Sequence, residues 1–301
     1  MFTQQKVMFI YAVSPIHMGA GTALGLIDNP IQREVHTGWP SMAGSGIKGA
    51  IRHALTGQEG WKNGKLMAIF GPEAGTSDLH AGAVSFTDAQ IVCFPVRSLR
   101  RAYVYATCPG ALARLKRLTG ADWEVPEVKK DSDALIANDA LKEDNRLILE
   151  ALAFDTPKEK EDTVSTIGEW LARNALTEGF FADKLKTDLV IVSDTDFTHF
   201  VRNSTLVEPH VRIDDETGAA AGTGLFYTEN LPPETLLVSL VMASKVRDGK
   251  MEKGAEQVIA DVAAALNNGK VWQFGGDATT GRGLVMLCMA ASKGGSDERK
   301  S

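Results

Sequence analysis

Short apolar runs, spread from one end of the chain to the other, most constrain how this protein can fold. The clearest are residues 7–13 (VMFIYAV), 188–193 (DLVIVS), 235–244 (TLLVSLVMAS) and 283–289 (GLVMLCM). Runs of this length, rich in β-branched and other apolar residues, are typical of buried β-strands. They are much shorter than the ~20 residues of a membrane-spanning helix, so the sequence predicts no membrane anchor.

Helical patterns lie between these strands. Residues 45–55 (SGIKGAIRHAL) place Ile47, Ile51 and Leu55 four residues apart, and Ser45 is expected to cap this helix. Amphipathic or short helices are also expected at 163–176, 194–204 and 255–269. Residues 81–96 predict a β-hairpin with Thr-Asp at its turn. This order fits an α+β fold of the ferredoxin-like or RRM-like kind, an antiparallel sheet with helices on one face.

The acidic residues are concentrated in one segment. Residues 121–164 hold 13 Asp and Glu against 6 Lys and Arg, in a chain with a net charge of −6. The remainder is therefore close to neutral and can present basic surfaces. Two basic stretches, 96–103 and 113–118, are candidates for nucleic-acid binding or for ordinary solvated surface. Residues 110–155 are helical in pattern, and we expect a helical insertion at about 97–187 within a single domain, 1–301.

The cysteines and the chain ends suggest a cellular compartment. Three cysteines are scattered, with neither a disulfide pattern nor the spacing of a zinc site. The N-terminal segment lacks the features of a signal peptide. We therefore expect a reduced, cytoplasmic protein, with a disordered tail at 293–301.

Two glycine-rich stretches have the chemistry of anion sites. In GGDATTGRG (275–283) the glycines allow close backbone approach, and Arg282 supplies a positive charge. In GSGIKGAIR (44–52) glycines precede a helix N-terminus, and Lys48 and Arg52 share one helix face. Neither stretch matches a dinucleotide or P-loop pattern, and structural turns or a surface Lys/Arg pair are the alternatives. If the chain ends meet in the fold, the two stretches form one extended phosphate-binding surface.

Asp28 stands in a long loop, residues 14–44, which is rich in proline and glycine. An acid before Asn-Pro can simply cap a turn. On an exposed loop it can also bind a divalent ion or orient a reacting hydroxyl. His17 lies in the same loop, where it is either a proton donor and acceptor or a structural histidine.

Together these stretches carry a family resemblance. SPIHMGAGTALGLIDNPIQREVHTGWPSMAGSGIKGAIRHAL, followed at a distance by FYTENLPPETLL and FGGDATTGRGLV, is similar to sequences of the RAMP superfamily of CRISPR proteins. Within that superfamily it resembles the repeated backbone subunit of the type III-B (Cmr) effector complex. The similarity covers residues 7–56 and about 205–289. It implies an RRM-like fold with a helical insertion and a protruding "thumb" hairpin at about 205–230.

The resemblance also implies a function. Several copies would stack along a guide crRNA, beside other type III-B subunits, and cut complementary target RNA at regular intervals. The ribose 2′-hydroxyl would attack its neighbouring phosphate, supported by Mg²⁺ or a similar ion. Asp28, the acid of the D-x-P-I-Q-R-E motif, would be catalytic and metal-binding, and His17 and Glu229 would be the other cleavage-linked residues. The RNA-binding residues would be Ser45, Gly46, Lys48, Arg52, His210, Arg212, Ile213, Gly276, Arg282 and Gly283.

Two alternatives stay open. The chain could be a guide-binding scaffold in which Asp28 is not catalytic, or the related backbone subunit of a type III-A complex. The intact D-x-P-I-Q-R-E motif favours the nuclease, and the long insertion with the ENLPPE stretch favours type III-B. We expect the acidic segment 121–164 to face away from RNA, since like charges repel.

Overall fold

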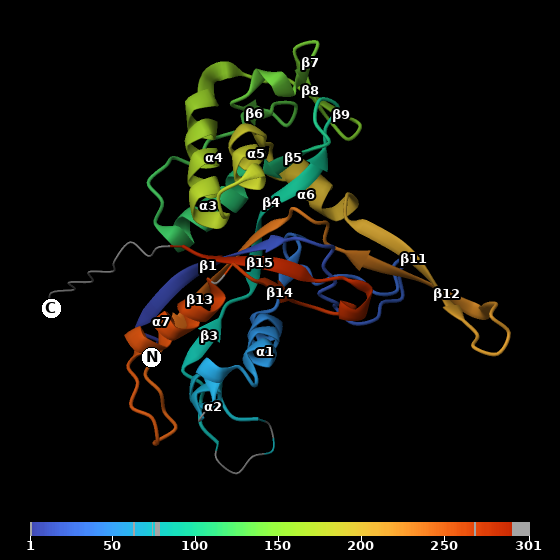
Figure 1. Ribbon diagram of the computed structural model, residues 1–301. Coiled ribbons are helices and arrows are strands. Elements are labelled where there is room, and N and C mark those ends of the chain that lie inside the picture. Colours follow the sequence, from blue (N-terminus) through green and yellow to red (C-terminus); the bar gives the residue numbers. More distant parts are fainter. Residues whose placement is uncertain (1, 63, 74, 76–78, 268, 291–301) are drawn as a thin grey trace.

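The computed structural model describes residues 2–62, 64–73, 75, 79–267 and 269–290, so the tail expected at 293–301 lies outside it. The fold is α+β, built on a large sheet with the strand order β14-β15-β1-β13-β4-β5-β10-β6 (Figure 1). Strands β5 and β10 run parallel, and the other neighbours are antiparallel. The four expected strands are confirmed as β1 (Gln4–Ala12), β10 (Leu189–Ile191), β13 (Leu236–Ala243) and β15 (Leu284–Met289). The other strands in this order are β14 (Val271–Gln273), β4 (Ala89–Arg97), β5 (Tyr103–Thr107) and β6 (Leu135–Ile136), and two short strands, 41–42 and 84–86, also pair with the sheet.

The centre of the sheet is formed by the two ends of the chain. Strand β1 lies between β13 and β15 and is antiparallel to both. Its side chains alternate between two cores: Met8 and Ile10 belong to one, and Phe9 and Tyr11 to the other. Both faces of the central strands are therefore buried, which is why these strands read as nearly continuous apolar runs.

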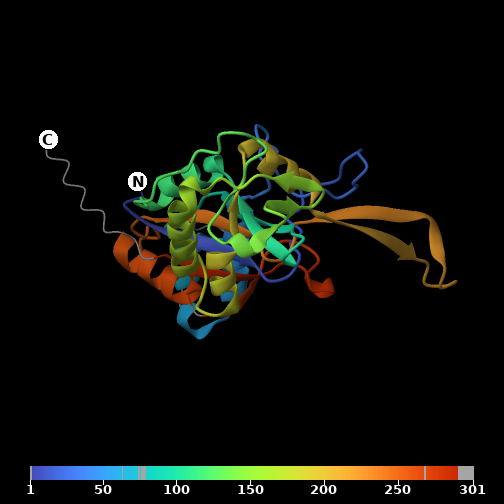
Figure 2. The same ribbon diagram turned by 90° about the horizontal axis from the view of Figure 1, so that it is seen from above.

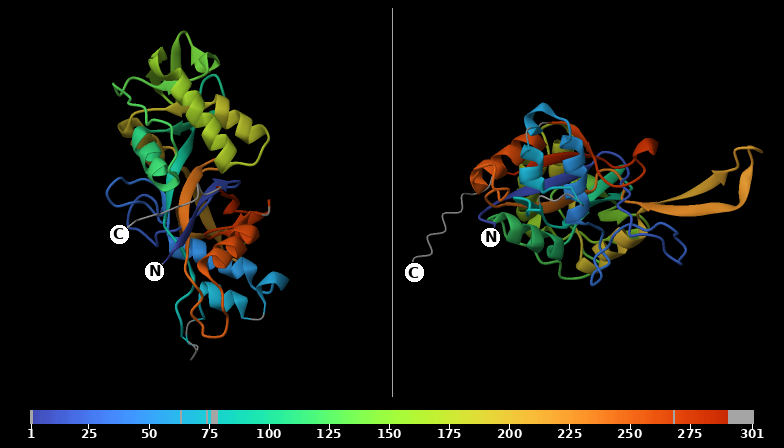
Figure 3. Two further views of the ribbon diagram at one scale, coloured as in Figure 1. Left: turned by 90° about the vertical axis from the view of Figure 1, so that its left-hand side faces the viewer. Right: turned by 90° about the horizontal axis from the view of Figure 1, so that it is seen from below.

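Helices cover both faces of the sheet (Figures 2 and 3). The first core contains the buried sides of α1 (Gly44–Leu55), α6 (Asp194–Asn203) and α7 (Ala255–Leu266). The second contains those of α4 (Glu161–Ala175) and α5 (Phe180–Thr187), and most of α3 (Pro109–Thr119). The expected antiparallel α+β fold is confirmed. The prediction that helices cover only one face is wrong for the whole sheet. Helices α1 and α7 share one face, and helices of the insertion cover the other.

Helix was wrongly predicted for much of 110–155. Only α3 is helical there. The rest contains β6, a 3₁₀ turn at Asp139–Leu141, and a small sheet of β7 (Lys142–Glu143), β8 (Arg146–Leu149) and β9 (Leu152–Phe154). Asp144 and Asn145 join β7 to β8 with φ of 46° and 63°, the conformation of a two-residue hairpin turn. Leu147 and Leu149 are buried on alternate positions, so the apolar period is that of a strand.

The hairpin predicted at 81–96 is also wrong. Strand β3 (Val84–Phe86) and β4 both pair antiparallel with β13, so the chain runs past Thr87 and Asp88 without reversing. The Asp88 carboxylate accepts a hydrogen bond from the Gly44 amide at 2.8 Å and satisfies the first turn of α1. Ser45 is therefore not the cap: Ala43 is the N-cap residue, and Ser45 is exposed inside the first turn.

The predicted hairpin at 205–230 is confirmed as β11 (Leu206–Ile213) and β12 (Ala220–Asn230), which project from the body (Figures 1 and 2). We call this hairpin the thumb. At its tip the Asp214 carboxylate accepts hydrogen bonds from the Glu216 and Thr217 amides, which explains the Asp-Glu-Thr-Gly turn. The remaining elements are β2 (Ser41–Met42), α2 (Lys65–Phe70) and the 3₁₀ turns Glu59–Trp61, Lys158–Lys160 and Ala278–Thr280. Among the described residues no helix is long and apolar enough to span a membrane.

Candidate functional site

The root of the thumb is joined to the 14–44 loop along one edge of β12. Tyr227 O accepts from Asn29 N, and Asn29 O accepts from Glu229 N, both at 3.0 Å. Ile16 and Leu231 exchange two backbone hydrogen bonds at 2.9 Å. The loop is therefore held as an added strand-like segment, and two side chains, Asp28 and His17, complete the pairing of this edge.

Asp28 fills one position on that edge. Its Oδ2 accepts a hydrogen bond from Tyr227 N at 2.7 Å. Among the described residues, no donor lies within hydrogen-bond distance of the other oxygen, Oδ1. The carboxylate is partly exposed, so one oxygen anchors the loop while the second faces outward. Each of the two hypotheses for Asp28 therefore describes one of its oxygens: Oδ2 has a structural hydrogen bond, and Oδ1 is free of described donors.

His17 fills a second position. Its Nδ1 lies 2.7 Å from Glu229 O, and because a carbonyl only accepts, Nδ1 carries the proton. In the neutral ring, Nε2 then presents a lone pair. The atoms that anchor Asp28 and His17 are two residues apart on an extended strand, roughly 7 Å. The Asp28 carboxylate and the His17 imidazole are therefore both anchored to the same edge of β12 at the thumb root.

Glu229 has a different environment from the other two. Its side chain is only 4% exposed. Oε1 pairs with the Arg33 guanidinium at 2.5 Å and accepts from Thr205 Oγ1 at 2.8 Å, and Oε2 accepts from Ile31 N at 3.1 Å. The structure places the Glu229 carboxylate inside the protein, with both oxygens engaged.

The two glycine-rich stretches meet at Met18, as expected if the chain ends come together. A Cβ at Gly46 would lie 3.0 Å from the Met18 methyl, and one at Gly275 would lie 3.3 Å from its sulfur. Gly276 N donates to His17 O at 2.9 Å. Gly283 has φ of 79°, and a Cβ there would collide with Phe274 O, so glycine is required. Residues 275–283 (the glycine loop), the loop around His17 and the start of α1 therefore form one continuous surface, which we call the glycine surface.

The cationic side chains of this surface differ in their availability. Arg282 is paired with Glu208 of the thumb at 2.6 Å, and Arg52 lies 3.6 Å from Glu73. Lys48 has no ion pair with a described residue, and burial together with the nearby Arg52 charge lowers its pKa. Ser45 and Gly46 are exposed at the N-terminus of α1, where helix amides favour an anion. Lys48 is thus a cation of this surface without a described carboxylate partner, and Ser45, Gly46 and Gly276 are exposed beside it.

The thumb has two unlike faces. His210 stacks on Phe226 with ring centroids 5.3 Å apart, and Arg212 follows on the same side of β11. Ile213 lies on the opposite side, with Val207 and Val211, and is 55% exposed. The structure shows the His210–Phe226 stack, and strand alternation, up to the register shift between Val211 and Ile213, predicts Arg212 on that side and Ile213 on the other.

The two basic stretches do not form a free cationic patch. Arg97, Arg100 and Arg101 lie near Glu150, Glu143 and Asp188 respectively. Arg114 binds Glu34 through both carboxylate oxygens at 2.9 Å. These arginines stabilise the insertion and the loop, and the solvated-surface alternative describes them better.

Among the described residues, no group of three or more His, Cys, Asp or Glu side chains could hold a metal ion. Of the two predicted cleavage-linked acids, Asp28 has a carboxylate oxygen without a described donor, whereas both oxygens of Glu229 are engaged. Mg²⁺ commonly binds through one or two carboxylates together with substrate phosphates and water. Asp28 would be the protein ligand in such a mode, and RNA phosphates and water would supply the remaining ligands.

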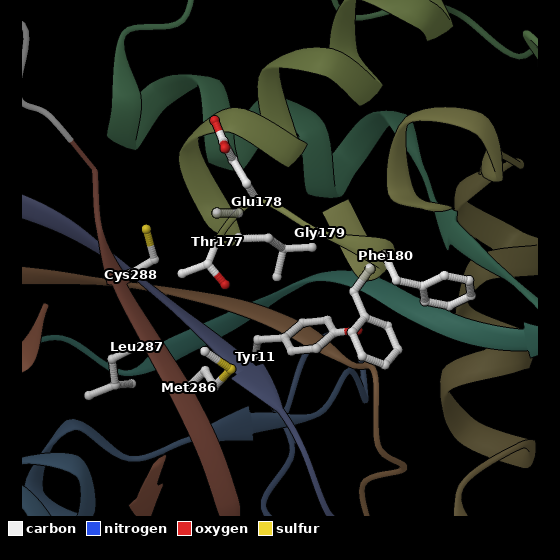
Figure 4. A pocket seen from close by; sticks show the side chains of 11 residues that line it. Tyr11, Thr177, Glu178, Gly179, Phe180, Met286, Leu287 and Cys288 are labelled. Atoms are coloured by element: carbon white, nitrogen blue, oxygen red, sulfur yellow. The ribbon is translucent and has the colours of Figure 1, made fainter. Parts of the chain in front are cut away.

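A separate cavity of about 90 Å³ lies beside β1, β15 and the α4–α5 connection, and none of the predicted site residues lines it (Figure 4). Tyr11, Phe180 and Met286 are among its walls. Below it the Tyr11 hydroxyl donates to the Glu234 carboxylate and lies 2.7 Å from the Tyr105 hydroxyl. Burial raises the pKa of Glu234, with the Tyr11 hydrogen bond opposing that shift.

Glu234→Gln is expected to raise the Tm slightly at pH 8, on the order of 1 °C. A carboxyl whose pKa is raised in the folded state stabilises the protein below its unfolded pKa, and this contribution is lost as the pH rises through the folded pKa. The neutral amide avoids that loss, so its advantage should disappear near pH 4. Thermal melts at both pH values, with exposed Glu169→Gln as control, measure the difference. An advantage that grows toward low pH would contradict it.

No role was predicted for Arg33 or Met18 from the sequence, although both organise the site. Arg33 lies within the D-x-P-I-Q-R-E motif, so its place in that motif was an available signal. Met18 carried no signal, because its role depends on two glycines far apart in the chain.

The sheet, the projecting hairpin and the glycine surface are features of an α+β protein that binds a nucleic-acid backbone. The RAMP superfamily model matches residues 9–285, and the chain belongs to that superfamily. It is 35% identical over 284 residues to the CRISPR system Cmr endoribonuclease Cmr4 of Pyrococcus furiosus, covering 93% of this chain and 94% of that protein. The CRISPR system CMR subunit Cmr4 of Saccharolobus solfataricus is 23% identical, over 95% and 96% of the two chains.

Solved structures agree with this assignment. Oligomeric Cmr4 from Pyrococcus furiosus superposes with a TM-score of 0.73 at 29% identity, covering 96% of this chain and 99% of that one. A chain of the type III-B Cmr-beta complex bound to cognate target RNA has a TM-score of 0.72 at 19% identity, over 96% and 98% of the two chains, and supports the fold.

Proposed function

We propose that this protein is the endoribonuclease backbone subunit of a type III-B CRISPR complex. Several copies bind one guide crRNA beside other subunits of the complex, and each copy cuts the paired target RNA next to its Asp28. The observation that carries this proposal is that Asp28 and His17 are both anchored to one edge of β12, at the root of a projecting hairpin, with the Asp28 Oδ1 oxygen left without a described donor. The relative that is 35% identical is named an endoribonuclease of this system, which supports it.

The reacting groups belong mostly to the RNA. The ribose 2′-oxygen attacks the neighbouring phosphorus, the bond from phosphorus to the 5′-oxygen breaks, and the leaving 5′-oxygen takes a proton from water. His17 Nε2 accepts the proton of the 2′-hydroxyl, and Asp28 Oδ1 orients the phosphodiester and would be the protein ligand of a bound Mg²⁺. Mg²⁺ supplies charge neutralisation at the phosphate when bound. The thumb and the anchored loop hold the target strand in line, which accounts for a site with few side chains.

The guide path follows the glycine surface. Exposed amides at the start of α1 and the Lys48 ammonium approach phosphates, and the glycine loop allows close backbone contact. Acids of the 121–164 segment are partly neutralised within the insertion, as in the Lys129–Glu159 and Arg146–Asp155 pairs. We keep the prediction that this segment faces away from RNA, and crosslinks from it to the guide would contradict that prediction.

A cleavage assay on the assembled complex tests the proposal. With Mg²⁺, a labelled complementary RNA should give evenly spaced products, and a single 2′-deoxynucleotide at one cut position should remove that product alone. EDTA should stop all cuts. Cutting at the deoxy position would exclude the 2′-hydroxyl as nucleophile, cutting in EDTA would exclude the metal, and tight target binding without products would favour the scaffold alternative.

A further inference from the structure

Arg33 has no part in the chemistry above, yet its guanidinium lies where three segments meet. Nη2 pairs with Glu229 of β12 at 2.5 Å. Nη1 donates to Gly38 O at 2.8 Å and to Val201 O of α6 at 3.0 Å. One side chain therefore ties the loop after Asp28 to the thumb strand and to the end of α6.

Glu229 is the acceptor at the centre of this junction. Its oxygens take donors from Arg33, Thr205 and Ile31, and its side chain is almost fully buried. A buried carboxylate with donors on both oxygens has little capacity left for an RNA group or an ion. Removing one partner of such a pair leaves an unpaired buried charge, which is strongly unfavourable.

The junction reaches Asp28 through a short piece of backbone. Ile31 N binds Glu229, and Asn29 is hydrogen-bonded to β12 through both its N–H and its carbonyl. On the other side of Asp28, residues 20–26 are exposed. The segment from Asn29 to Arg33 is therefore the hydrogen-bonded side of the loop. The position of the Asp28 carboxylate depends on this segment.

We propose that Arg33 and Glu229 form a positioning pair, which holds the Asp28 carboxylate at the thumb root, and that Glu229 does not touch the RNA. This inference rests on the proposed function of Asp28. A displacement of about 1 Å at a reacting group can slow a reaction 100-fold. Loss of the pair should therefore slow cleavage and leave guide and target binding intact.

A double-mutant cycle in the assembled complex tests the pair. Arg33→Met, Glu229→Gln and the double variant should each cleave 10- to 100-fold more slowly in single turnover, with target Kd within two-fold of the parent. If the two residues act as a unit, the double variant is no slower than Arg33→Met alone. Arg97→Met, which breaks the exposed Arg97–Glu150 pair, is the matched control and should cleave normally.

Hydrogen exchange gives a readout that does not depend on activity. The Asn29 and Glu229 amides should exchange faster in Arg33→Met and Glu229→Gln, while amides of the central strand β1 stay unchanged. Losses that multiply in the double variant, with unchanged exchange, would overturn the positioning pair and make Glu229 a reacting group. Should Asp28→Asn cleave normally, the role of Asp28 fails instead, and the exchange data still decide whether the pair holds the loop.

Discussion

Asp28→Asn is expected to slow target cleavage by about 10²- to 10³-fold, the usual range for loss of one electrostatic group at the reacting centre, without weakening guide or target binding. Asparagine retains an oxygen that can accept from Tyr227 N, so the anchor seen at 2.7 Å survives. What disappears is the negative charge, together with the outward carboxylate oxygen. Single-turnover cleavage at saturating complex, compared with target Kd, measures the two effects separately.

Further variants separate charge from anchoring. Asp28→Ala removes both, so it should cleave as slowly as Asp28→Asn and also speed amide exchange at Tyr227. Asp248→Asn is the matched control, because Asp248 likewise accepts from backbone amides, at Lys250 and Met251, in a loop outside the site. Normal cleavage by Asp28→Asn with slow cleavage by Asp28→Ala would show that Asp28 only anchors the loop.

Gly44→Ala should destabilise the protein by about 3 kcal/mol or more, because an added methyl group is forced into a packed site. A Cβ at Gly44 would lie inside 3.0 Å of the Phe86 and Thr87 backbone. Backbone cannot rotate away as a flexible side chain can, so α1 would have to shift from β3. For a chain of this size, we expect the Tm to fall by roughly 5 °C.

Gly49→Ala is the matched control in the same helix. Nothing lies within 4 Å of a Cβ there, and alanine is favoured over glycine in a helix interior by up to about 1 kcal/mol. This variant should match or exceed the parent in Tm. Equal melting of the two alanine variants would contradict the close approach of α1 to β3.

Much of the fold could be predicted because its signals are local. The apolar residues of β1 form a short continuous run that is typical of a buried strand, and those of α7 recur at the spacing of one helix face. The predictions failed where the partner decided the outcome. Residues 120–155 are mixed in pattern, and pairing within the insertion made them strands. Thr87 and Asp88 have turn chemistry, yet β13 continues alongside them and keeps the chain straight.

The site shows the same division. His17, Asp28 and the two glycine stretches were candidates because their residue types and neighbours carry chemistry. Glu229 was a candidate through the family resemblance, but its burial against Arg33 depends on residues that are 196 positions apart. Ile213 was grouped with His210 by sequence, and strand alternation places it on the other thumb face.

The sequence by itself determined the class of fold, the family and which residues are chemically able to act, because these depend on local periodicity and on short motifs. Only the tertiary structure decided which Asp28 oxygen accepts from Tyr227 N and which His17 nitrogen carries the proton. It also decided that the Glu229 carboxylate is buried and hydrogen-bonded within the protein. Each of these follows from hydrogen bonds between the 14–44 loop and β12. Such hydrogen bonds form only when segments that are distant in sequence come together, and a local sequence pattern cannot predict which segments do so.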